Sequence, residues 1–359
     1  MPIVRFLVFV FGAAIVLITL RSAVRTYLLP RAAPDGVTRV TFRTLRRLFD
    51  LRALPIKTYP ERDRVFAYYG PVALLVLLTA WLILVLLGYM SMFWAAGVEP
   101  WSRAFAVSGS SLFTLGFETV DTLPQKVLAF TEAALGPLLI ALLIGYMPTI
   151  YGAFSKREAL VNLLEVRAGS PPSAVDLIVR YHRLHRIERI NEMWAAWETW
   201  FAELEETHTS LAMLNFFRSP IPEHSWVTAA GAVLDAASLV VSTVDVPFNV
   251  QAPLCIRGGY IALRRIADFF RIPYNPDPKP DDPISLSRAQ FDHACELLTL
   301  EGVPLVADRD QAWRDFAGWR VNYDVTLLAL ARLTLAPPAP WSSPEMPEQR
   351  RPPLYGQGS

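Results

Sequence analysis

The feature that most constrains this chain is a run of 34 residues without a charged side chain, between Arg64 and Glu99. A helix needs about 20 apolar residues to cross a bilayer. The run, which contains YYGPVALLVLLTAWLILVLLGYM, therefore predicts a transmembrane helix. Aromatic residues of the kind that favour membrane interfaces lie near its ends: Tyr68, Tyr69, Trp94 and Trp101.

Two further segments are apolar enough to span a membrane. One covers residues 126–154 and is interrupted only by Glu132, and the other, FLVFVFGAAIVLITL, covers residues 6–20 between Arg5 and Arg21. A secretory signal peptide is the alternative for residues 6–20, but no small-x-small cleavage site follows it cleanly. Flanking arginines can reach the headgroups and lengthen a short span, so a retained helix is expected. The sequence thus predicts an all-α membrane protein with three transmembrane helices.

The basic residues predict the orientation of these helices. Residues 21–64 carry ten arginines and one lysine against four acidic residues, an excess of seven positive charges. Such loops stay cytoplasmic, so the first helix runs inward, the second outward and the third inward again. We therefore expect a multi-pass protein of the cell membrane with residues 97–123 outside and everything after Lys156 in the cytosol. The basic loop can also contact anionic lipid, although a topology signal alone explains its charge.

A short polar segment separates the second and third apolar stretches. Its first half, WSRAFAVSGSSLF, is expected to form a short helix with Ser102 as the N-cap. The TLGF sequence that follows is not helical in character, and non-helical backbone at membrane depth is tolerated only where it lines a cavity or is buried in protein. Glycine permits the backbone angles that turn successive carbonyls to one side, where they can replace the water around a cation.

The segment AFAVSGSSLFTLGFE, residues 104–118, resembles the pore helix and selectivity filter of the potassium-channel superfamily. The matched positions are Ser108, Ser111 and Leu112 in the pore helix and Thr114, Leu115, Gly116 and Phe117 in the filter. The apolar stretch after it is similar to the inner helix of the two-helix pore-domain members, including the bacterial ion channels. The resemblance covers about residues 66–158 and implies a re-entrant pore helix and filter between two spanning helices.

The resemblance implies a cation channel, and one filter segment per chain implies a homotetramer. The permeant ion would be K⁺ or Na⁺, and no other cofactor is expected. The match departs from the family at three positions: Glu118 replaces the second filter glycine, Thr119 the following aspartate, and Phe117 the tyrosine. We therefore expect the inner carbonyl rings from Thr114 to Gly116 to be retained and the outer ones to be lost or rearranged, which would relax selectivity.

Glu118 and Asp121 are expected at the outer mouth, where four copies of each would attract cations. The alternative is that Glu118 turns away from the axis and bonds to the backbone or to Arg103. A second function also stays open, namely a non-conducting membrane sensor or scaffold that keeps the channel architecture. An enzyme is not expected, because no nucleophile–base or paired-carboxylate arrangement stands out in the sequence.

The third apolar stretch contains four residues of types that can break or kink a helix. These candidate gating hinges are Gly136, Pro137, Gly145 and Pro148. Proline removes an intrahelical hydrogen bond and kinks a helix. Glycine and proline are also simply more frequent in membrane helices, so both interpretations are open. Glu132 should face protein or water, and support for the back of the filter is favoured over a place in the pore lining.

The rest of the chain completes the domain plan. The expected parts are a first transmembrane helix at 1–29, a basic cytosolic linker at 30–64, a pore domain at 65–158, a helical cytosolic domain at 159–335 and a disordered proline-rich tail at 336–359. The stretch SWVTAAGAVLDAASLVVSTVDVP is apolar enough to be mistaken for a fourth span, but its central Asp235 favours a buried helix. Trp194, Trp197 and Phe201 form one apolar stripe at helical spacing, typical of a core or of a contact between subunits.

No metal site is expected. His182 and His185 lie one helical turn apart with Glu188 on the same face, but a further strong zinc ligand is missing. The two cysteines, Cys255 and Cys295, are expected to be reduced in a cytosolic domain. With a net charge of +1 the chain has no overall basic excess, and no nucleic-acid partner is expected.

Overall fold

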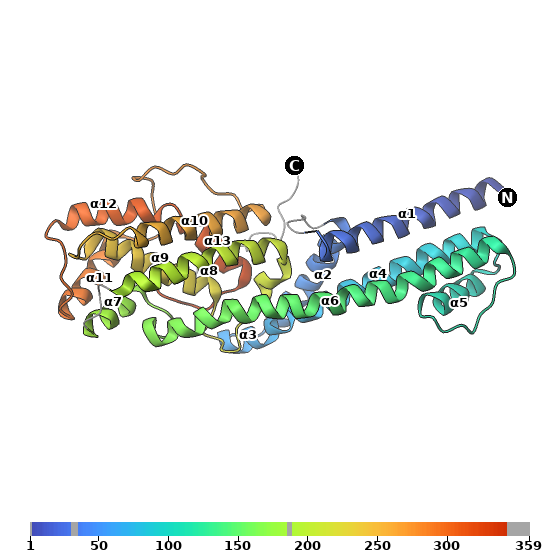
Figure 1. The fold of residues 1–359 in the computed structure, drawn as a ribbon, viewed down its shortest axis with the longest axis horizontal. Coiled ribbons are helices and arrows are strands. Elements are labelled where there is room, and N and C mark those ends of the chain that lie inside the picture. The colour runs from blue at the N-terminus through green and yellow to red at the C-terminus, as the bar shows by residue number, and fades with distance from the viewer. Residues whose placement is uncertain (1, 30–34, 185–188, 343–359) are drawn as a thin grey trace. The chain divides into compact units, whose positions relative to one another are not determined.

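The computed structural model describes residues 2–29, 35–184 and 189–342, and these residues form an all-α protein (Figure 1). The chain divides into two compact units. Unit 1 comprises Met1–Leu54 and Tyr68–Gly152, and unit 2 comprises Pro55–Ala67 and Ala153–Ser359. The division therefore falls inside the segment that was expected to be one pore domain, six residues before its predicted end at 158.

Four helical stretches are long and apolar enough to cross a membrane, which is the pattern of a multi-pass membrane protein. They are α1 (Pro2–Tyr27), the stretch Tyr59–Ala95 that ends in α4 (Tyr69–Ala95), α6 (Leu123–Ala168) and α9 (Trp226–Thr243). The last differs from the others, because 94% of its apolar window is buried inside the protein. This agrees with the expectation of a buried helix around Asp235.

Helices α1 and α4 pack closely within unit 1. A Cβ on Gly88 would lie 2.7 Å from Val16 Cγ2 and 2.9 Å from the carbonyl oxygen of Gly12, so small residues let the two backbones approach. Further along the same pair, Trp81 Nε1 donates a hydrogen bond of 3.0 Å to Ser22 Oγ. The first apolar stretch therefore packs against α4 within unit 1.

The basic segment 30–64, expected to be a linker, is largely helical in its described part. Helix α2 (Gly36–Ala53) belongs to unit 1, and α3 (Tyr59–Ala67) belongs to unit 2. Asp35 is the N-cap of α2 and accepts a hydrogen bond of 2.9 Å from Thr38 N.

Helix α5 (Trp101–Leu112) lies between α4 and α6 in the sequence, as the pore-helix resemblance implied. Ser102 is not its N-cap: the helix begins at Trp101 after Pro100, which has no side-chain cap bond. Trp101 stacks on Trp94 with ring centroids 4.7 Å apart. Helix α6 passes through both Pro137 and Pro148 without an interruption.

Glycine allows α6 to touch the end of α5. A Cβ at Gly136 would collide with the carbonyl oxygen of Leu112, the last residue of α5. A Cβ at Gly145, nine residues further along α6, would meet no atom within 4 Å. The two glycines among the hinge candidates therefore differ: Gly136 lies in close contact with α5, and Gly145 faces open space.

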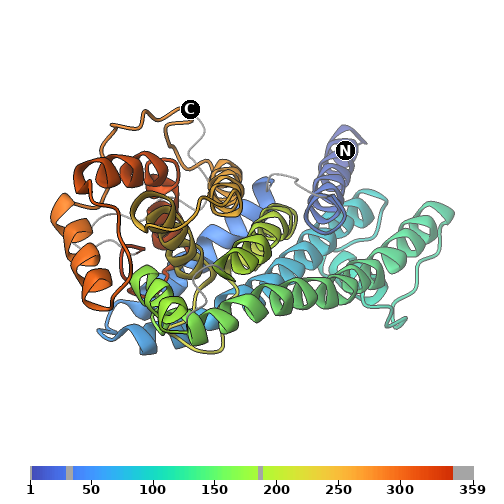
Figure 2. The same ribbon diagram turned by 60° about the vertical axis from the view of Figure 1, so that its left-hand side comes forward.

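Unit 2 is a helical bundle around α9, which packs against α7, α10, α12 and α13 (Figure 2). Its elements after α6 are α7 (Ala174–Arg183), α8 (Ile190–Ser210), η2 (Ala212–Phe216), α9, α10 (Gln251–Phe269), α11 (Arg288–Leu300), α12 (Arg309–Arg320) and α13 (Asp324–Thr334). The stripe of Trp194, Trp197 and Phe201 on α8 is buried, as expected for a core.

The charge in α9 is neutralised inside the bundle. Asp235 forms an ion pair with Arg320, which is itself fully buried, and Tyr323 OH donates to Asp235 Oδ1 over 2.8 Å. Arg320 Nε also donates to Asp324 Oδ1 over 2.9 Å. A buried charge is tolerated when it is paired and hydrogen-bonded, and this one fixes α9 to α12 and α13.

Residues 336–342 are ordered against unit 2, which corrects the expectation that the disordered tail begins at 336. Arg320 Nη2 donates to Trp341 O over 2.6 Å, and the Trp341 ring lies 5.8 Å from that of Phe316. Ser342 is buried. The remainder of the predicted tail, 343–359, lies outside the described residues.

We expect Gly136→Ala to destabilise the full-length protein in detergent by about 1–3 kcal/mol, the usual cost of overpacking. Gly145→Ala is the matched control on the same helix, and its new methyl group should be neutral or stabilising by up to about 1 kcal/mol because alanine favours the helix. Thermal unfolding followed by circular dichroism measures both. Equal shifts in the two variants would contradict the close contact between α5 and α6.

Candidate functional site

The back of helix α5 is tied to its neighbours by Ser108. Its Oγ lies 3.0 Å from Leu86 O on α4 and 2.6 Å from Glu132 Oε1 on α6, and both Ser108 and Glu132 are fully buried. The carboxyl group of Glu132 therefore faces protein rather than lipid, and it contacts the helix that leads into the TLGF segment. Glu132 and Gly136, one turn apart on α6, both meet α5, at Ser108 and Leu112.

The segment after α5 has an unusual backbone. Thr114 has φ = 54° and Gly116 has φ = 71°, whereas Leu115, between them, has a negative φ. A positive φ is uncommon for threonine and is easy for glycine. Thr114 is the left-handed residue that ends α5, since Leu115 N donates to Ser110 O over 2.8 Å and Thr114 N donates to Ser111 O over 3.0 Å. Gly116 is a second left-handed residue two positions further on.

Ser110 holds the outer part of this segment. Its Oγ accepts hydrogen bonds from Phe117 N (3.1 Å) and Glu118 N (3.2 Å). Ser111, in contrast, is half-buried, and its hydroxyl forms no hydrogen bond within the described ranges. The resemblance to a pore helix pointed to Ser108 and Ser111 but not to Ser110. A serine in the last turn of a helix before an irregular segment was the only signal for it.

The apolar side chains of the segment point away from the chain's own core. Leu115 is 63% exposed and Phe117 is 64% exposed, although both sit between two apolar helices. Glu118 is half-buried and Asp121 is exposed. The Glu118 carboxylate forms no hydrogen bond or ion pair with any described residue, Arg103 included.

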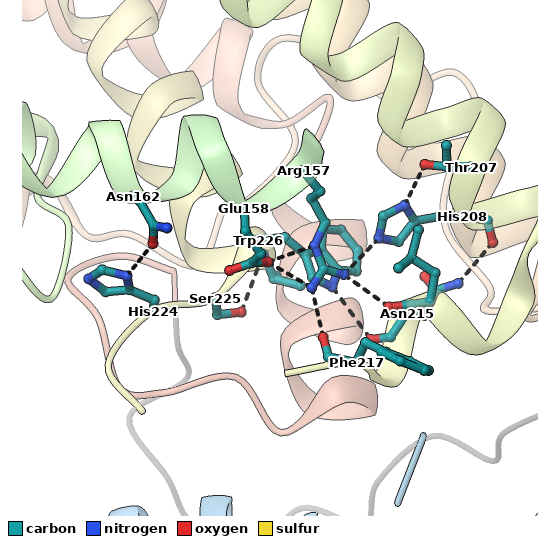
Figure 3. A network of polar contacts seen from close by, with 12 residues as sticks. Arg157, Glu158, Asn162, Thr207, His208, Asn215, Phe217, His224, Ser225 and Trp226 are labelled. Carbon is teal, nitrogen blue, oxygen red and sulfur yellow. Dashed lines mark hydrogen bonds and ion pairs between the residues drawn. The ribbon is translucent and has the colours of Figure 1, made fainter. Parts of the chain in front are cut away.

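A second polar site lies in unit 2, where the last turns of α6 meet α8 and the chain that follows it (Figure 3). Arg157 of α6 is buried and is surrounded by acceptors. Its guanidinium donates to Glu158 Oε1 (2.8 Å from Nε), to Leu214 O (2.9 Å) and to Phe217 O (2.7 Å). In return, Trp200 Nε1 donates to the carbonyl oxygen of Arg157 over 3.2 Å.

His208 of α8 completes this network. Its Nδ1 lies 2.9 Å from Leu204 O and its Nε2 lies 3.3 Å from Arg157 Nη1. An arginine can only donate, so Nε2 accepts and the ring is neutral with its proton on Nδ1. Burial and the Arg157 charge lower the pKa of His208 well below its ordinary value of 6.5, while the bond to Leu204 O opposes the shift.

The residue next to Phe217 extends the network to α3. Arg218 forms an ion pair with Asp63 of α3 and donates to Thr334 O over 2.7 Å at the end of α13. Tyr59 OH, also on α3, donates to Leu335 O over 3.0 Å. The short stretch 214–218 is thus bonded on one side to α6 and on the other to α3, the helix that precedes α4 in the chain.

A cavity of 380 Å³ opens beside the network. Lys156 and Arg157 line it from α6, and Trp200, Glu203 and Thr207 line it from α8. No group of three metal-ligating side chains occurs among the described residues. His182 lies on α7, but His185 and Glu188 lie outside the described ranges. Cys255 and Cys295 are both free and buried.

Comparisons with protein-family models, with curated proteins and with solved structures found no match.

Ser110→Ala should weaken the outer part of the segment, because it removes the acceptor for two backbone N–H groups at a cost of about 1 kcal/mol. Hydrogen exchange measured by mass spectrometry should become faster at peptides that contain residues 117 and 118. Ser111→Ala is the control and should leave this exchange unchanged. Faster exchange in both variants, or in neither, would show that Ser110 does not hold the segment.

The neutral His208 predicts a pH dependence of stability. The unfolded chain takes up a proton on this ring below about pH 6.5 and the folded chain does not, so stability is lost as the pH falls, by up to about 1.4 kcal/mol per pH unit. Thermal unfolding between pH 7.5 and 5 should show a flatter slope for His208→Gln than for the wild type. The control His293→Gln, at a largely exposed side chain, should keep the wild-type slope.

Proposed function

We propose that four copies of the chain form a cation channel of the potassium-channel type in the cell membrane. The observation that carries the proposal is the backbone of residues 114–116. A left-handed Thr114, a Leu115 with negative φ and a left-handed Gly116 follow the short helix α5. Such an alternation aims carbonyl oxygens to one side, and a ring of four such segments can replace the hydration shell of a cation.

In this proposal the filter has only its inner part. Thr114, Leu115 and Gly116 supply the carbonyl rings for K⁺ or Na⁺. Glu118 does not adopt the positive φ that a second filter glycine would permit, and its backbone N–H is held by Ser110. Fewer carbonyl rings mean weaker discrimination between the two ions, so relaxed selectivity is part of the proposal.

The exposed apolar side chains support a homotetramer. Leu115 and Phe117, together with Phe105 of α5 and Phe113 directly after α5, are all about half exposed or more in the single chain. Neighbouring copies around a four-fold axis would cover them. Glu118 and Asp121 of each copy would then lie near the outer mouth, where a ring of carboxylates raises the local concentration of cations.

The gating route in this proposal runs through unit 2. Three helices cross the membrane, and the basic segment after α1 keeps unit 2 in the cytosol. Helix α6 continues into unit 2, where Arg157 binds the chain at Leu214 and Phe217, and Arg218 binds α3. A signal that repacks residues 214–218 would therefore act on α3, which precedes α4 in the chain, and on the last turns of α6. The cavity beside Arg157 offers a place for a small molecule to do so.

A non-conducting membrane sensor or scaffold is the second candidate, and Glu118 at the position of the second filter glycine favours it. Recording from the purified protein in planar bilayers separates the two. A well-folded tetramer that passes neither K⁺ nor Na⁺ at any pH or calcium concentration would favour the scaffold.

Gly116→Ala should abolish or strongly reduce conductance, because a Cβ disfavours the left-handed backbone that the filter requires. Gly109→Ala is the matched control within α5, since its new Cβ would meet only one atom, Leu86 Cδ1, at 4.0 Å. Single-channel currents in symmetrical K⁺ and under bi-ionic K⁺/Na⁺ conditions measure the effect. Unchanged conductance and selectivity in Gly116→Ala would refute the assignment of the filter.

A further inference from the structure

The face of helix α2 opposite to its contacts with α1 and α4 carries a combination of groups that the proposed channel function leaves unexplained. The inner face is well packed. Phe42 and Leu45 are buried, and Phe42 O accepts a hydrogen bond of 3.3 Å from Tyr69 OH. Thr38 Oγ1 lies 3.3 Å from Ser22 Oγ of α1. One side of α2 is thus fixed to both neighbouring helices of unit 1.

The outer face is apolar and exposed. Val40, Leu48 and Leu51 are 62%, 57% and 62% exposed, and Leu54, directly after the helix, is 75% exposed. At 3.6 residues per turn these positions form one stripe along α2. A stripe of four aliphatic side chains in water is unfavourable, and such patches mark contact surfaces.

Arginines run through the same face. Arg47 lies within the aliphatic stripe, and Arg43 and Arg52 lie on its two edges. Arg47 and Arg52 are exposed and Arg43 is half-buried. None of the three forms a hydrogen bond or an ion pair with a residue in the described ranges. The outer face therefore offers three guanidinium groups around an apolar centre. Asp50 lies beside Arg43 at the edge of this face, and its carboxylate is paired with Arg46 over 3.5 Å.

The position of α2 indicates what covers this face. Its first turn contacts Ser22, near the end of α1, and its middle contacts Tyr69, the first residue of α4. The helix therefore lies at the depth where one candidate span ends and the next begins, which is the boundary between water and lipid. A helix with an apolar stripe flanked by arginines binds in the plane of such a boundary, and guanidinium groups pair with phosphate.

We propose that the outer face of α2 binds the surface of a membrane that contains anionic phospholipid. The aliphatic stripe enters the region between headgroups and acyl chains. Arg43, Arg47 and Arg52 hold headgroup phosphates, and their charges select anionic over zwitterionic lipid. This interaction needs α1 and α4 in the membrane but does not depend on conduction through residues 114–116.

The experiment places a bimane label at Leu48→Cys in the full-length protein, reconstituted in nanodiscs. The native cysteines are both buried, so brief labelling modifies the new site. Phosphatidylcholine or phosphatidylglycerol with a doxyl group near the headgroup serves as the quencher. We expect both lipids to quench the label and phosphatidylglycerol to do so at lower mole fraction. A label at Arg314→Cys, exposed on α12, should be quenched by neither.

The charge dependence is tested with Arg43→Gln/Arg47→Gln/Arg52→Gln. The preference for phosphatidylglycerol should fall about fivefold for each arginine removed, as expected for one basic residue at an anionic surface. The control Arg257→Gln/Arg271→Gln/Arg314→Gln removes the same charge from unit 2 and should keep the preference. If the triple variant does not fold, Arg47→Gln alone is measured, with a fivefold loss expected.

Three results would each overturn the proposal. The first is a label at residue 48 that neither lipid quenches in the wild type. The second is equal quenching by the two lipids in the wild type, and the third is a lipid preference that the arginine variant retains. A chain that does not conduct but shows the expected quenching would refute the channel and leave the lipid contact in place.

Discussion

The packing of the last turns of helix α6 within unit 2 depends on the hydrogen bonds of the buried Arg157 guanidinium. Removing an arginine from water costs several kcal/mol unless every donor finds a partner. Glu158, Leu214 O, Phe217 O and His208 together provide those partners. Because three of these partners come from residues 208–217, the last turns of α6 cannot leave this stretch without exposing an unpaired charge.

The same stretch is also fixed to α3 by Arg218. Asp63 and the carbonyl oxygens of residues 334 and 335 surround that second guanidinium. Two adjacent positions, 217 and 218, thus connect the continuation of one candidate span with the helix that leads into another. Within unit 2, residues 214–218 therefore hold both α3 and the last turns of α6.

Much of the helical plan could be predicted from the sequence, because long uncharged runs and helical spacing are local signals. The buried helix around Asp235 was expected for the same reason, since one carboxylate in the middle of an apolar run requires a partner. That the partner is Arg320, 85 residues away, could not be predicted, because no local pattern encodes a long-range ion pair. The ordered segment 336–342 was missed on similar grounds: its proline-rich composition predicted disorder, and its contacts with α12 are tertiary.

The position of the candidate filter in the chain could be predicted from the sequence, but the contacts that hold it could not. Thr114 and Gly116 stood out by sequence, whereas Ser110 and the bond between Ser108 and Glu132 depend on which faces of α5 meet α6. Gly136 shows why such contacts could not be predicted. As a glycine in an apolar helix it suggested a hinge, and its close packing is evident only from the position of Leu112 O. Gly136 and Gly145, the two glycines among the hinge candidates, look alike in sequence, and three-dimensional contacts alone distinguish them.

The exposed side chains around residues 105–117 connect this local geometry to assembly. The N–H groups of residues 114, 115, 117 and 118 are bonded to α5, whereas the carbonyl oxygens of residues 114–118 accept no hydrogen bond from any described residue. A membrane could cover Phe105 and Phe113, but it offers no donor for these carbonyl oxygens at that depth. Water alone would satisfy those groups and leave Leu115 and Phe117 unfavourably exposed. A surrounding that is apolar on one side and polar on the other would suit both, and the proposed ring of four chains around an ion-filled axis would be one such surrounding.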